Sequence, residues 1–450
     1  MSIEPALAAA NAALDAVLDS QWQGIPALVL RSPPGAGKTG VAQRVALQSA
    51  TYLRQRCMVV TQTNEQAYDL TRRLVTNRAG LAIYMFARKG LNLPDDLRQN
   101  TRLRTVERTG DLPAEPSITI GNAAKWSWID SADAMFDMQI VDEAFQLPDY
   151  KYHLISNLAP RHALIGDPGQ IDPFVNCEIE RWRCDPSGPQ VSCPVALVKR
   201  HPEVLQLALP VSRRLNEDTV RFVQPAFYPD MPFRAMSRDR SIGFQVEGIM
   251  PFDAALDGVA TGASIVMVEL PPQITGEADS ELAEEMVTSI VRLLHRRAWM
   301  SDDGRVRDVT AADIGVVCAH VSQVNAVRER LGPALSEVFV ETANRFQGIE
   351  RPFMFAHHPL SGRADATAFH LDAGRLCVML SRHRIGCWLF GRQGIMEQLT
   401  RFAPAGERAL GIDEDPEYRG WRAHLTLLDT LSRANRMYPA VYGLAPSNAA

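Results

Sequence analysis

The sequence has no apolar run that approaches the roughly 20 residues required for a membrane-spanning helix. Its first segment, MSIEPALAAANAALDAVLDS, lacks a basic stretch followed by an apolar one, so we expect an amphipathic helix here and not a signal peptide. The seven cysteines are scattered and odd in number, which argues against a disulfide framework. These absences favour a cytoplasmic protein with no membrane partner.

An excess of positive charge is also lacking, since 47 Lys and Arg residues face 52 Asp and Glu residues and the net charge is -5. This balance argues against binding of nucleic acid by bulk charge, although a local basic groove would still be compatible with it. The densest basic segment is 85–108, where three acidic residues accompany Arg88, Lys89, Arg98, Arg102, Arg104 and Arg108. A solvated helix face would explain this segment equally well.

A glycine-rich segment, SPPGAGKTG at 32–40, separates the apolar run IPALVL from the helix-like VAQRVALQSA. A strand, a glycine-rich loop and a helix in this order are the context of a phosphate-binding loop. We expect Lys38 to reach the β- and γ-phosphates and Thr39 to hold Mg²⁺. The predicted phosphate-binding residues are Pro34, Gly35, Ala36, Gly37, Lys38, Thr39 and Gly40. The alternative is a Gly/Pro turn that carries a surface lysine.

Two further apolar runs end in polar side chains suited to the same site. In FDMQIVDEAFQ (136–146), Asp142 is predicted to bind Mg²⁺ and Glu143 to activate the attacking water. In HALIGDPGQIDP (162–173), Gln170 is placed to contact the γ-phosphate. A plain polar turn is the alternative for this last segment.

Eight segments occur in the order and at the spacing of superfamily 1 helicases. The chain resembles the branch that contains the nonsense-mediated-decay RNA helicase and related DNA helicases, and this resemblance covers roughly residues 25–395. The matching segments are SPPGAGKT (motif I), VVTQTNEQAYDLTRRL (Ia), ITIGNAAKW (the following strand motif), VDEAFQ (II), GDPGQIDP (III), PVSRRLNEDTVRFVQPAFY (IV), VFVETANRFQGIERPFMF (V) and GRLCVMLSRHR (VI).

The resemblance implies an α/β fold with two tandem RecA-like domains, each with a parallel sheet flanked by helices, and one ATP in the cleft between them. Arg214 and Arg382 would be the arginine fingers that stabilise charge on the transferring phosphoryl group. Glu350 would contact the ribose, and Gln347 and Gly348 would line the γ-phosphate side. ATP and Mg²⁺ are the implied cofactors.

The resemblance also implies a single strand of DNA or RNA bound across both domains. The matching candidates for this contact are Thr63, Asn64, Lys125, Trp126 and Thr342. Polar side chains at these positions would hold phosphates, and an aromatic side chain could stack on a base. A core position is the alternative for Trp126.

The sequence departs from the family pattern at two points. The family carries an aromatic residue that stacks on adenine just before the motif IV arginine, and Arg213 stands there, which leaves GTP or relaxed base specificity open. Little chain is inserted between the motifs, so ATP hydrolysis is a firmer expectation than duplex unwinding. We therefore expect an ATP-dependent motor on single-stranded DNA or RNA. The alternative is a nucleotide-gated ATPase that responds to a protein partner.

The length of 450 residues is compatible with two or three domains. We predict an N-terminal helix in 1–24 and a first RecA-like domain in 25–175, with a small insertion at about 80–117. A connection in 176–205 leads to the second RecA-like domain in 206–410. A C-terminal helix and tail are predicted for 411–450.

Overall fold

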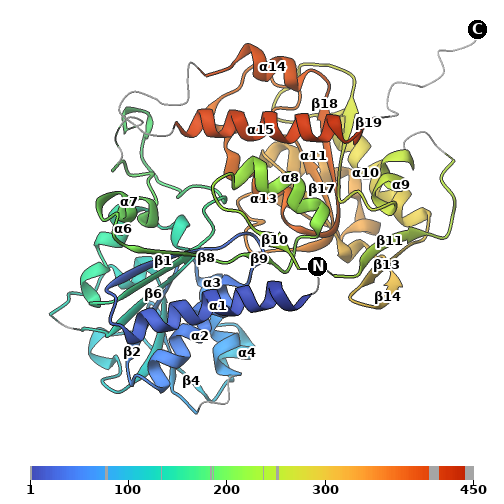
Figure 1. Cartoon of the computed structure of the whole chain (residues 1–450). Coiled ribbons are helices and arrows are strands. Elements are labelled where there is room, and N and C mark those ends of the chain that lie inside the picture. Colours follow the sequence, from blue (N-terminus) through green and yellow to red (C-terminus); the bar gives the residue numbers. More distant parts are fainter. Residues whose placement is uncertain are drawn as a thin grey trace, which may run out of the picture. The chain divides into compact units, whose positions relative to one another are not determined.

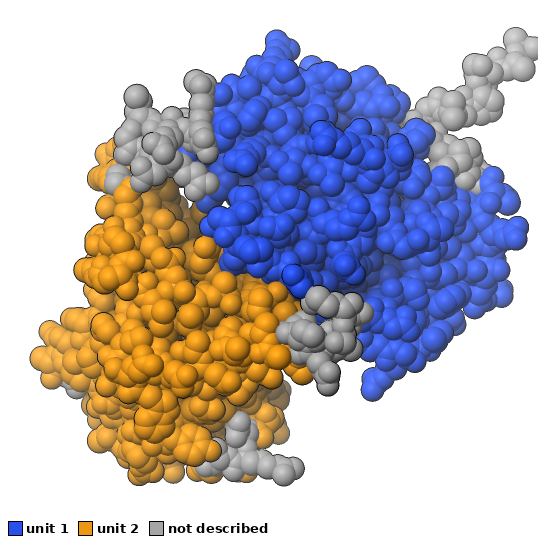
Figure 2. Space-filling view, viewed as in Figure 1, with its two compact units in different colours: residues 1–3, 169–171, 212–450 blue, residues 4–168, 172–211 orange. Residues whose placement is uncertain are grey.

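The computed structural model describes residues 3–76, 80–132, 134–182, 185, 187–236, 238–249, 253–404 and 415–440. The chain forms two compact units, drawn in orange and blue in Figure 2. Residues 4–168 and 172–211 make up the N-terminal unit (orange). The C-terminal unit (blue) consists chiefly of the chain from 212 onwards, together with residues 169–171.

The N-terminal unit is built on one eight-stranded sheet in the order β4-β3-β5-β2-β6-β7-β1-β8, and every neighbouring pair is parallel. Its central strands are almost wholly buried, as expected for a parallel sheet covered by helices on both faces. The strands are β1 (Ala27–Arg31), β2 (Arg56–Thr61), β3 (Ile83–Phe86), β4 (Leu103–Val106), β5 (Ser117–Asn122), β6 (Met138–Asp142), β7 (His162–Gly166) and β8 (Leu205–Ala208).

Helices cover both faces of this sheet (Figure 1). One face packs against α1 (Ile3–Trp22), α2 (Lys38–Thr51) and α3 (Asn64–Val75). The other packs against α5 (Ala123–Trp126), α6 (Asp149–His153) and α7 (Cys193–Arg200), and the short α4 (Asp95–Arg98) lies between β3 and β4 in the chain. Alternate residues of each strand serve the two faces, so Val59 joins the first core and Met58 and Val60 the second.

The C-terminal unit has a six-stranded sheet in the order β16-β15-β17-β18-β12-β19, again with every pair parallel. The strands are β12 (Ile265–Leu270), β15 (Ile314–Cys318), β16 (Phe339–Thr342), β17 (Arg351–His357), β18 (His383–Arg392) and β19 (Met437–Pro439). One face is covered by α8 (Glu217–Phe227), α13 (Ala373–Leu380), α14 (Ile395–Arg401) and α15 (Pro416–Arg433), with α12 (Ala368–Leu371) before α13. The other face is covered by α9 (Asp253–Ala260), α10 (Ser280–His295) and α11 (Val321–Leu331).

A small antiparallel sheet, β11 (Arg240–Phe244), β13 (Ala298–Asp302) and β14 (Arg305–Asp308), accompanies the large one. Asp303 and Gly304 join β13 to β14, and both have positive φ, 54° and 81°. Two residues with positive φ and an Asp-Gly sequence are typical of a type I′ hairpin turn, which fixes the register of the strands on either side. Asp302 consequently lies opposite Arg240 on one side and Arg305 on the other.

The predicted fold class is confirmed, because each unit is a parallel sheet flanked by helices. Several domain boundaries in the structure differ from those predicted from the sequence. The predicted insertion at 80–117 supplies β3 and β4, two strands of the main sheet. The predicted connection at 176–205 lies within the N-terminal unit, and β8 pairs with β1 just before the chain changes unit at 211–212. Across the described segments, every helix falls short of the length and apolar character needed to cross a membrane.

This change of unit falls within β9 (Val211–Ser212), which pairs with β10 (Arg234–Ala235). The helix predicted at the N-terminus is α1, whose Leu14 and Val17 are part of the core of the N-terminal unit. The predicted C-terminal helix is α15, and the predicted tail from 441 onwards lies outside the described residues.

Candidate functional site

The predicted phosphate-binding loop connects the end of β1 to the start of α2. The Ser32 amide donates to the carbonyl of Gly166 at the end of β7, which fixes the start of the loop (2.8 Å). Gly35 and Gly37 have φ of 72° and 92°, in the left-handed region that glycine adopts without steric cost. Gly37 directly precedes α2, so the amides of this turn lie at a helix N-terminus, which favours bound phosphate. Pro34 and Ala36 are buried within the loop, and Gly40 lies in the first turn of α2.

Lys38, the first residue of α2, forms an ion pair with Glu143. Its Nζ lies 3.1 Å from Glu143 Oε1, and each side chain is 13% exposed. Glu143 follows β6 with φ 55° and ψ 43°, a left-handed conformation that costs a non-glycine residue about 1–2 kcal/mol. Its other carboxylate oxygen accepts a hydrogen bond from Gln146 Nε2 (3.3 Å). Strained backbone of this kind concentrates at functional sites.

Asp142, the last residue of β6, is buried beside the same lysine. Burial is the main cause that raises the pKa of its carboxyl group to about 6, and the negative charge of Glu143 adds to the effect. Lys38 and a hydrogen bond from Thr39 act in the opposite direction. A carboxylate and a hydroxyl are the hard oxygen ligands that Mg²⁺ prefers, so Thr39 and Asp142 fit a magnesium site.

Gln170 is grouped with the C-terminal unit, although the sequence places its motif in the first domain. Residues 169–171 pack there against the start of α13. A Cβ atom on Gly374 would lie only 2.3 Å from the Gln170 carbonyl oxygen, so only glycine permits this approach. The Gln170 side chain is itself buried.

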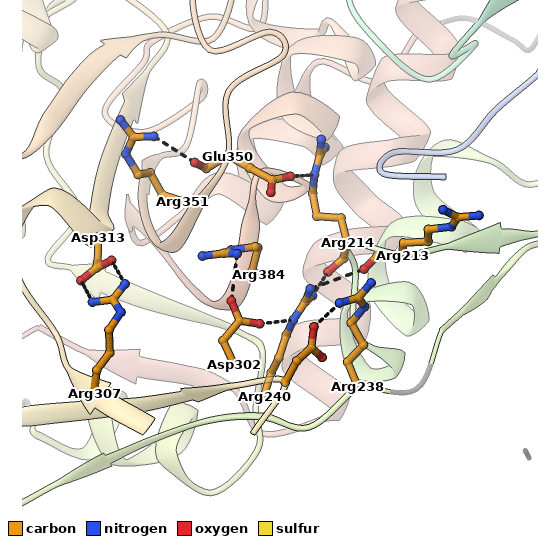
Figure 3. A network of polar contacts seen from close by, with 11 residues as sticks. Arg213, Arg214, Arg238, Arg240, Asp302, Arg307, Asp313, Glu350, Arg351 and Arg384 are labelled. Carbon is orange, nitrogen blue, oxygen red and sulfur yellow. Dashed lines mark hydrogen bonds and ion pairs between the residues drawn. The ribbon is translucent and has the colours of Figure 1, made fainter. Parts of the chain in front are cut away.

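Arg214, the first predicted arginine finger, forms an ion pair with Glu350, the predicted ribose contact (Figure 3). Arg214 Nε lies 2.6 Å from Glu350 Oε2, and Arg214 Nη1 donates to the Ser381 carbonyl at 3.4 Å. Burial raises the pKa of Glu350, but the charges of Arg214, Arg384 and Arg240 outweigh it, and the pKa lies below its usual value. The carboxylate is therefore ionised at neutral pH.

An unpredicted network supports the backbone of this arginine. Arg240 donates from its guanidinium group to the carbonyls of Arg213 (3.5 Å) and Arg214. Asp302 accepts from Arg240 Nε at 2.9 Å, and its second oxygen lies 2.8 Å from Arg384 Nη1. Figure 3 shows this carboxylate between the two guanidinium groups. The Asp-Gly pair at 303–304 was the sequence signal that could have revealed the hairpin.

Arg382, the second predicted arginine finger, is buried, and its carbonyl accepts from the Arg351 amide (3.0 Å). Gln347 and Gly348 lie in the loop between β16 and β17, where Gly348 has φ 82°. Thr342 ends β16, and its carbonyl accepts from the amides of Arg345 and Phe346. The structure thus brings Arg214, Glu350 and the segment of Arg382 together within one unit.

Thr63 and Asn64, predicted nucleic-acid contacts, lie where β2 leads into α3. Thr63 caps α3 through the Gln66 amide and is exposed. Asn64 accepts a hydrogen bond from Asn122 Nδ2 (2.6 Å), which joins the ends of β2 and β5. The segment of Thr63 and Asn64 and the segment that begins after Asn122 are therefore adjacent in space. The resemblance assigns both to contact with single-stranded nucleic acid.

Trp126 differs from its predicted role as a surface contact, and Lys125 contacts the loop after β4. Lys125 Nζ donates to the Glu107 carbonyl (2.8 Å) and lies 4.2 Å from the centre of the Phe86 ring. Trp126 is fully buried, so the core alternative for this residue is correct. Trp128, two residues later, is 86% exposed and was missed, because sequence spacing does not tell which of two neighbouring tryptophans points outward.

Comparison with known proteins supports the helicase assignment. Residues 264–394, from β12 to β18, match the family model of an AAA domain. A stretch of 267 residues is 26% identical to the DNA replication ATP-dependent helicase/nuclease dna2 of Schizosaccharomyces pombe. These two matches support a superfamily 1 helicase-like P-loop NTPase. The second match covers 57% of this chain and 18% of the length of the relative.

Three solved helicase structures are also similar to this chain. The PRRSV helicase matches with a TM-score of 0.43 and 14% identity, over 89% of this chain and 58% of the viral one. The helicase nonstructural protein 10 of an arterivirus matches with a TM-score of 0.43 and 15% identity, over 81% and 59% of the two chains. The same protein in complex with DNA gives 0.42 and 15%, over 81% and 60%.

Proposed function

We propose that this chain is a Mg²⁺-dependent ATPase whose hydrolysis is coupled to binding of, or movement along, single-stranded DNA or RNA. The observation that supports this most directly is the grouping of Lys38, at the start of α2, with Asp142 and Glu143 at the carboxyl end of β6. Lys38 and Glu143 are 3.1 Å apart, and Asp142 is hydrogen-bonded by Thr39. A cytoplasmic location is part of the proposal.

Each residue of this group has a distinct part in the proposed reaction. The amides of the loop around Gly35 and Gly37 would bind the phosphates, and Lys38 would neutralise their charge. Thr39 and Asp142 would hold Mg²⁺, which when bound supplies charge neutralisation at the phosphate oxygens. Glu143 would orient and deprotonate the attacking water. Binding of phosphate requires Lys38 to exchange its ion pair with Glu143 for phosphate oxygens, which frees the carboxylate for this task.

The arginines of the C-terminal unit supply the second part of the proposal. Guanidinium groups are planar, always charged and suited to phosphoryl oxygens. Arg214 is held at its side chain by Glu350 and at its backbone by Arg240, so it is fixed in place before any nucleotide is bound. Arg382 is assigned the same role by the family resemblance.

Steady-state ATP hydrolysis with and without single-stranded DNA and RNA tests the proposal, with Glu143→Gln as the inactive variant. We expect at least tenfold stimulation by one of the two, equivalent to about 1.4 kcal/mol of coupling. Asp15→Asn, an exposed carboxylate change on α1, is the control and should retain the activity. A rate that Glu143→Gln abolishes but neither nucleic acid stimulates would contradict the motor and favour a protein-regulated ATPase.

A further inference from the structure

In the C-terminal unit, the chain around the start of α8 is hydrogen-bonded to the chain around the start of β18. Arg214 lies just before α8, and Arg382 directly precedes β18, so these contacts join the segments of the two predicted arginine fingers. Every second residue of 381–385 takes part. The contacts are Arg214 Nη1 to the Ser381 carbonyl (3.4 Å), Thr219 Oγ1 to His383 Nε2 (2.8 Å) and Asn216 Nδ2 to the Ile385 carbonyl (3.5 Å).

The contact of His383 is the first link of a hydrogen-bonded chain that ends in an ion pair. At its far end, both Nη atoms of Arg436 donate to the Asp218 carboxylate, with Nη2 at 2.7 Å from Oδ1. Burial raises the pKa of Asp218, but the hydrogen bonds from Arg436 and Ser264 outweigh burial, and the pKa lies below its usual value. Asp218 is therefore ionised at neutral pH and can only accept hydrogen bonds.

The charge on Asp218 determines the direction of every hydrogen bond in the chain. Ser264 donates to Asp218 Oδ2 from its hydroxyl (2.7 Å) and from its amide (2.8 Å). A hydroxyl has a single proton, so Ser264 Oγ accepts from Thr219 Oγ1 at 2.8 Å. The Thr219 proton is then in use, and its oxygen accepts from His383 Nε2. The imidazole consequently carries a proton on Nε2.

The other ring nitrogen of His383 requires this imidazole to be neutral. The residue is 1% exposed, and Nδ1 is buried without a hydrogen-bond partner among the described residues. Burial is the main cause that lowers its pKa to about 3. A proton on Nδ1 would be a buried donor with no acceptor, which is costly. The ring is thus held in one tautomer by a single contact, the hydroxyl of Thr219.

The chain is anchored on three other elements of the C-terminal unit. Thr219 and Asp218 are in the first turn of α8, Ser264 directly precedes β12, and Arg436 directly precedes β19. Asn216 caps α8 by accepting from the Thr219 amide (2.7 Å). Successive hydrogen bonds that end at a charge polarise and strengthen one another. The backbone next to Arg382 is therefore fixed through the side chain of its neighbour.

We propose that His383 is a positioning residue for Arg382 and Arg214, held in place by the chain of Thr219, Ser264, Asp218 and Arg436. The chain keeps the two arginine segments in register, so that both guanidinium groups are in place when the phosphates arrive. This proposal rests on the proposed function and adds to it residues that would not contact the nucleotide.

Steady-state ATP hydrolysis by the full chain tests the proposal with two amide variants of His383. The amide nitrogen of glutamine can take the place of Nε2 and donate to Thr219, whereas the shorter asparagine reaches only the place of Nδ1. His383→Asn should lower kcat about tenfold or more and change KM little, because misplaced arginines affect mainly the transition state. His383→Gln should keep most of the rate. Thermal melting verifies that each variant folds.

A second pair of variants changes the acceptor of the histidine proton. Thr219→Val lacks the hydroxyl and should lower kcat as His383→Asn does, whereas Thr219→Ser keeps the hydroxyl and the rate. Thr430→Val is the matched control, because the Thr430 hydroxyl donates to the Thr426 carbonyl within α15 (2.6 Å) and is outside the chain of hydrogen bonds. It should leave kcat unchanged.

The middle of the chain is tested by Ser264→Ala, alone and combined with Thr219→Val. Residues that act as one unit give non-additive losses, so the double variant should be no slower than Thr219→Val alone. A double variant whose loss of kcat equals the product of the two single losses would contradict the chain.

The outcomes separate this proposal from the proposed function. If the wild type hydrolyses ATP and His383→Gln is as slow as His383→Asn, the positioning role is overturned while the ATPase stands. If the wild type shows no hydrolysis that Glu143→Gln abolishes, both are overturned. If His383→Asn and Thr219→Val alone lose kcat, and His383→Gln, Thr219→Ser and Thr430→Val keep it, the proposal is supported.

Discussion

Asp302 lies directly opposite Arg240 in the small antiparallel sheet, and the two side chains pair at 2.9 Å. The same carboxylate pairs with Arg384, two residues after Arg382. One acid thus connects the backbone of the motif IV arginine to the motif VI segment. This relation makes Asp302 a positioning residue for the proposed arginine fingers.

Asp302→Asn should lower kcat for ATP about tenfold and change KM little, because displacement of a catalytic group mainly affects the transition state. Steady-state ATP hydrolysis assays measure both kcat and KM. Asp303→Asn is the matched control, since Asp303 pairs with Arg238 at the hairpin turn and asparagine tolerates its positive φ. Equal loss of kcat in the two variants would contradict the positioning role, and Asp302→Glu should recover part of the rate.

Asp142→Asn should abolish Mg²⁺-dependent hydrolysis and yet stabilise the ligand-free protein at neutral pH. The pKa of Asp142 is about 6 in the folded state, above its usual 3.8, because burial disfavours the charge. The native state then binds more protons than the unfolded state between about pH 4 and pH 6, and stability falls as the pH rises through this window. Asparagine carries no charge, so the variant does not lose this stability as the pH rises.

Thermal denaturation with a chelator present, at intervals from about pH 4 to pH 7, measures this effect. The melting temperature of the variant relative to the wild type should increase up to about pH 6 and then remain constant. A wild type that is more stable than Asp142→Asn at pH 7 without metal would show that the carboxylate is not strained by burial.

The arrangement of the predicted nucleotide-binding residues of the N-terminal unit could be foreseen from the sequence because it depends on local geometry. Gly35 and Gly37 can adopt positive φ, Lys38 starts the next helix, and Asp142 ends a buried strand. The chain order of strand, loop and helix brings these residues to one edge of the sheet. Cys377, Met379 and His383, in the segment that matches motif VI, are buried.

The features that sequence reasoning missed depend on contacts between distant segments. Trp126 is buried because two carbonyls from β2 and β5 receive its indole N–H, and this determines that Trp128 is the exposed one. Lys125 is held by Glu107, 18 residues earlier, and Asp302 meets Arg240 only through the pairing of β11 with β13. No local pattern indicates such partners.

Gly374→Ala should destabilise the protein by about 1–3 kcal/mol, the usual cost of an added group in a packed site. The new Cβ would lie 2.3 Å from the Gln170 carbonyl oxygen and 2.6 Å from Ile171 Cα, both backbone atoms that must shift. Urea unfolding measures the change. Gly276→Ala in the same unit is the control, because its Cβ would meet nothing within 4 Å. Equal stability of the two variants would show that residues 169–171 do not pack tightly on α13.

Arg213→Ala should raise KM for ATP about tenfold and change kcat much less. Arg213 has its carbonyl engaged by Arg240 and its side chain exposed, and the family resemblance places a base-stacking residue at this position. A guanidinium over a ring contributes about 0.5–2 kcal/mol, and it stacks on adenine and guanine alike, so the same rise is expected for GTP. Arg213→Tyr should restore a low KM, whereas Arg213→Lys should not, because an ammonium has no planar face. Arg221→Ala, on the exposed surface of α8, is the control. A KM that responds to Arg213→Ala for ATP alone would show that this residue reads the base edge and does not stack on its face.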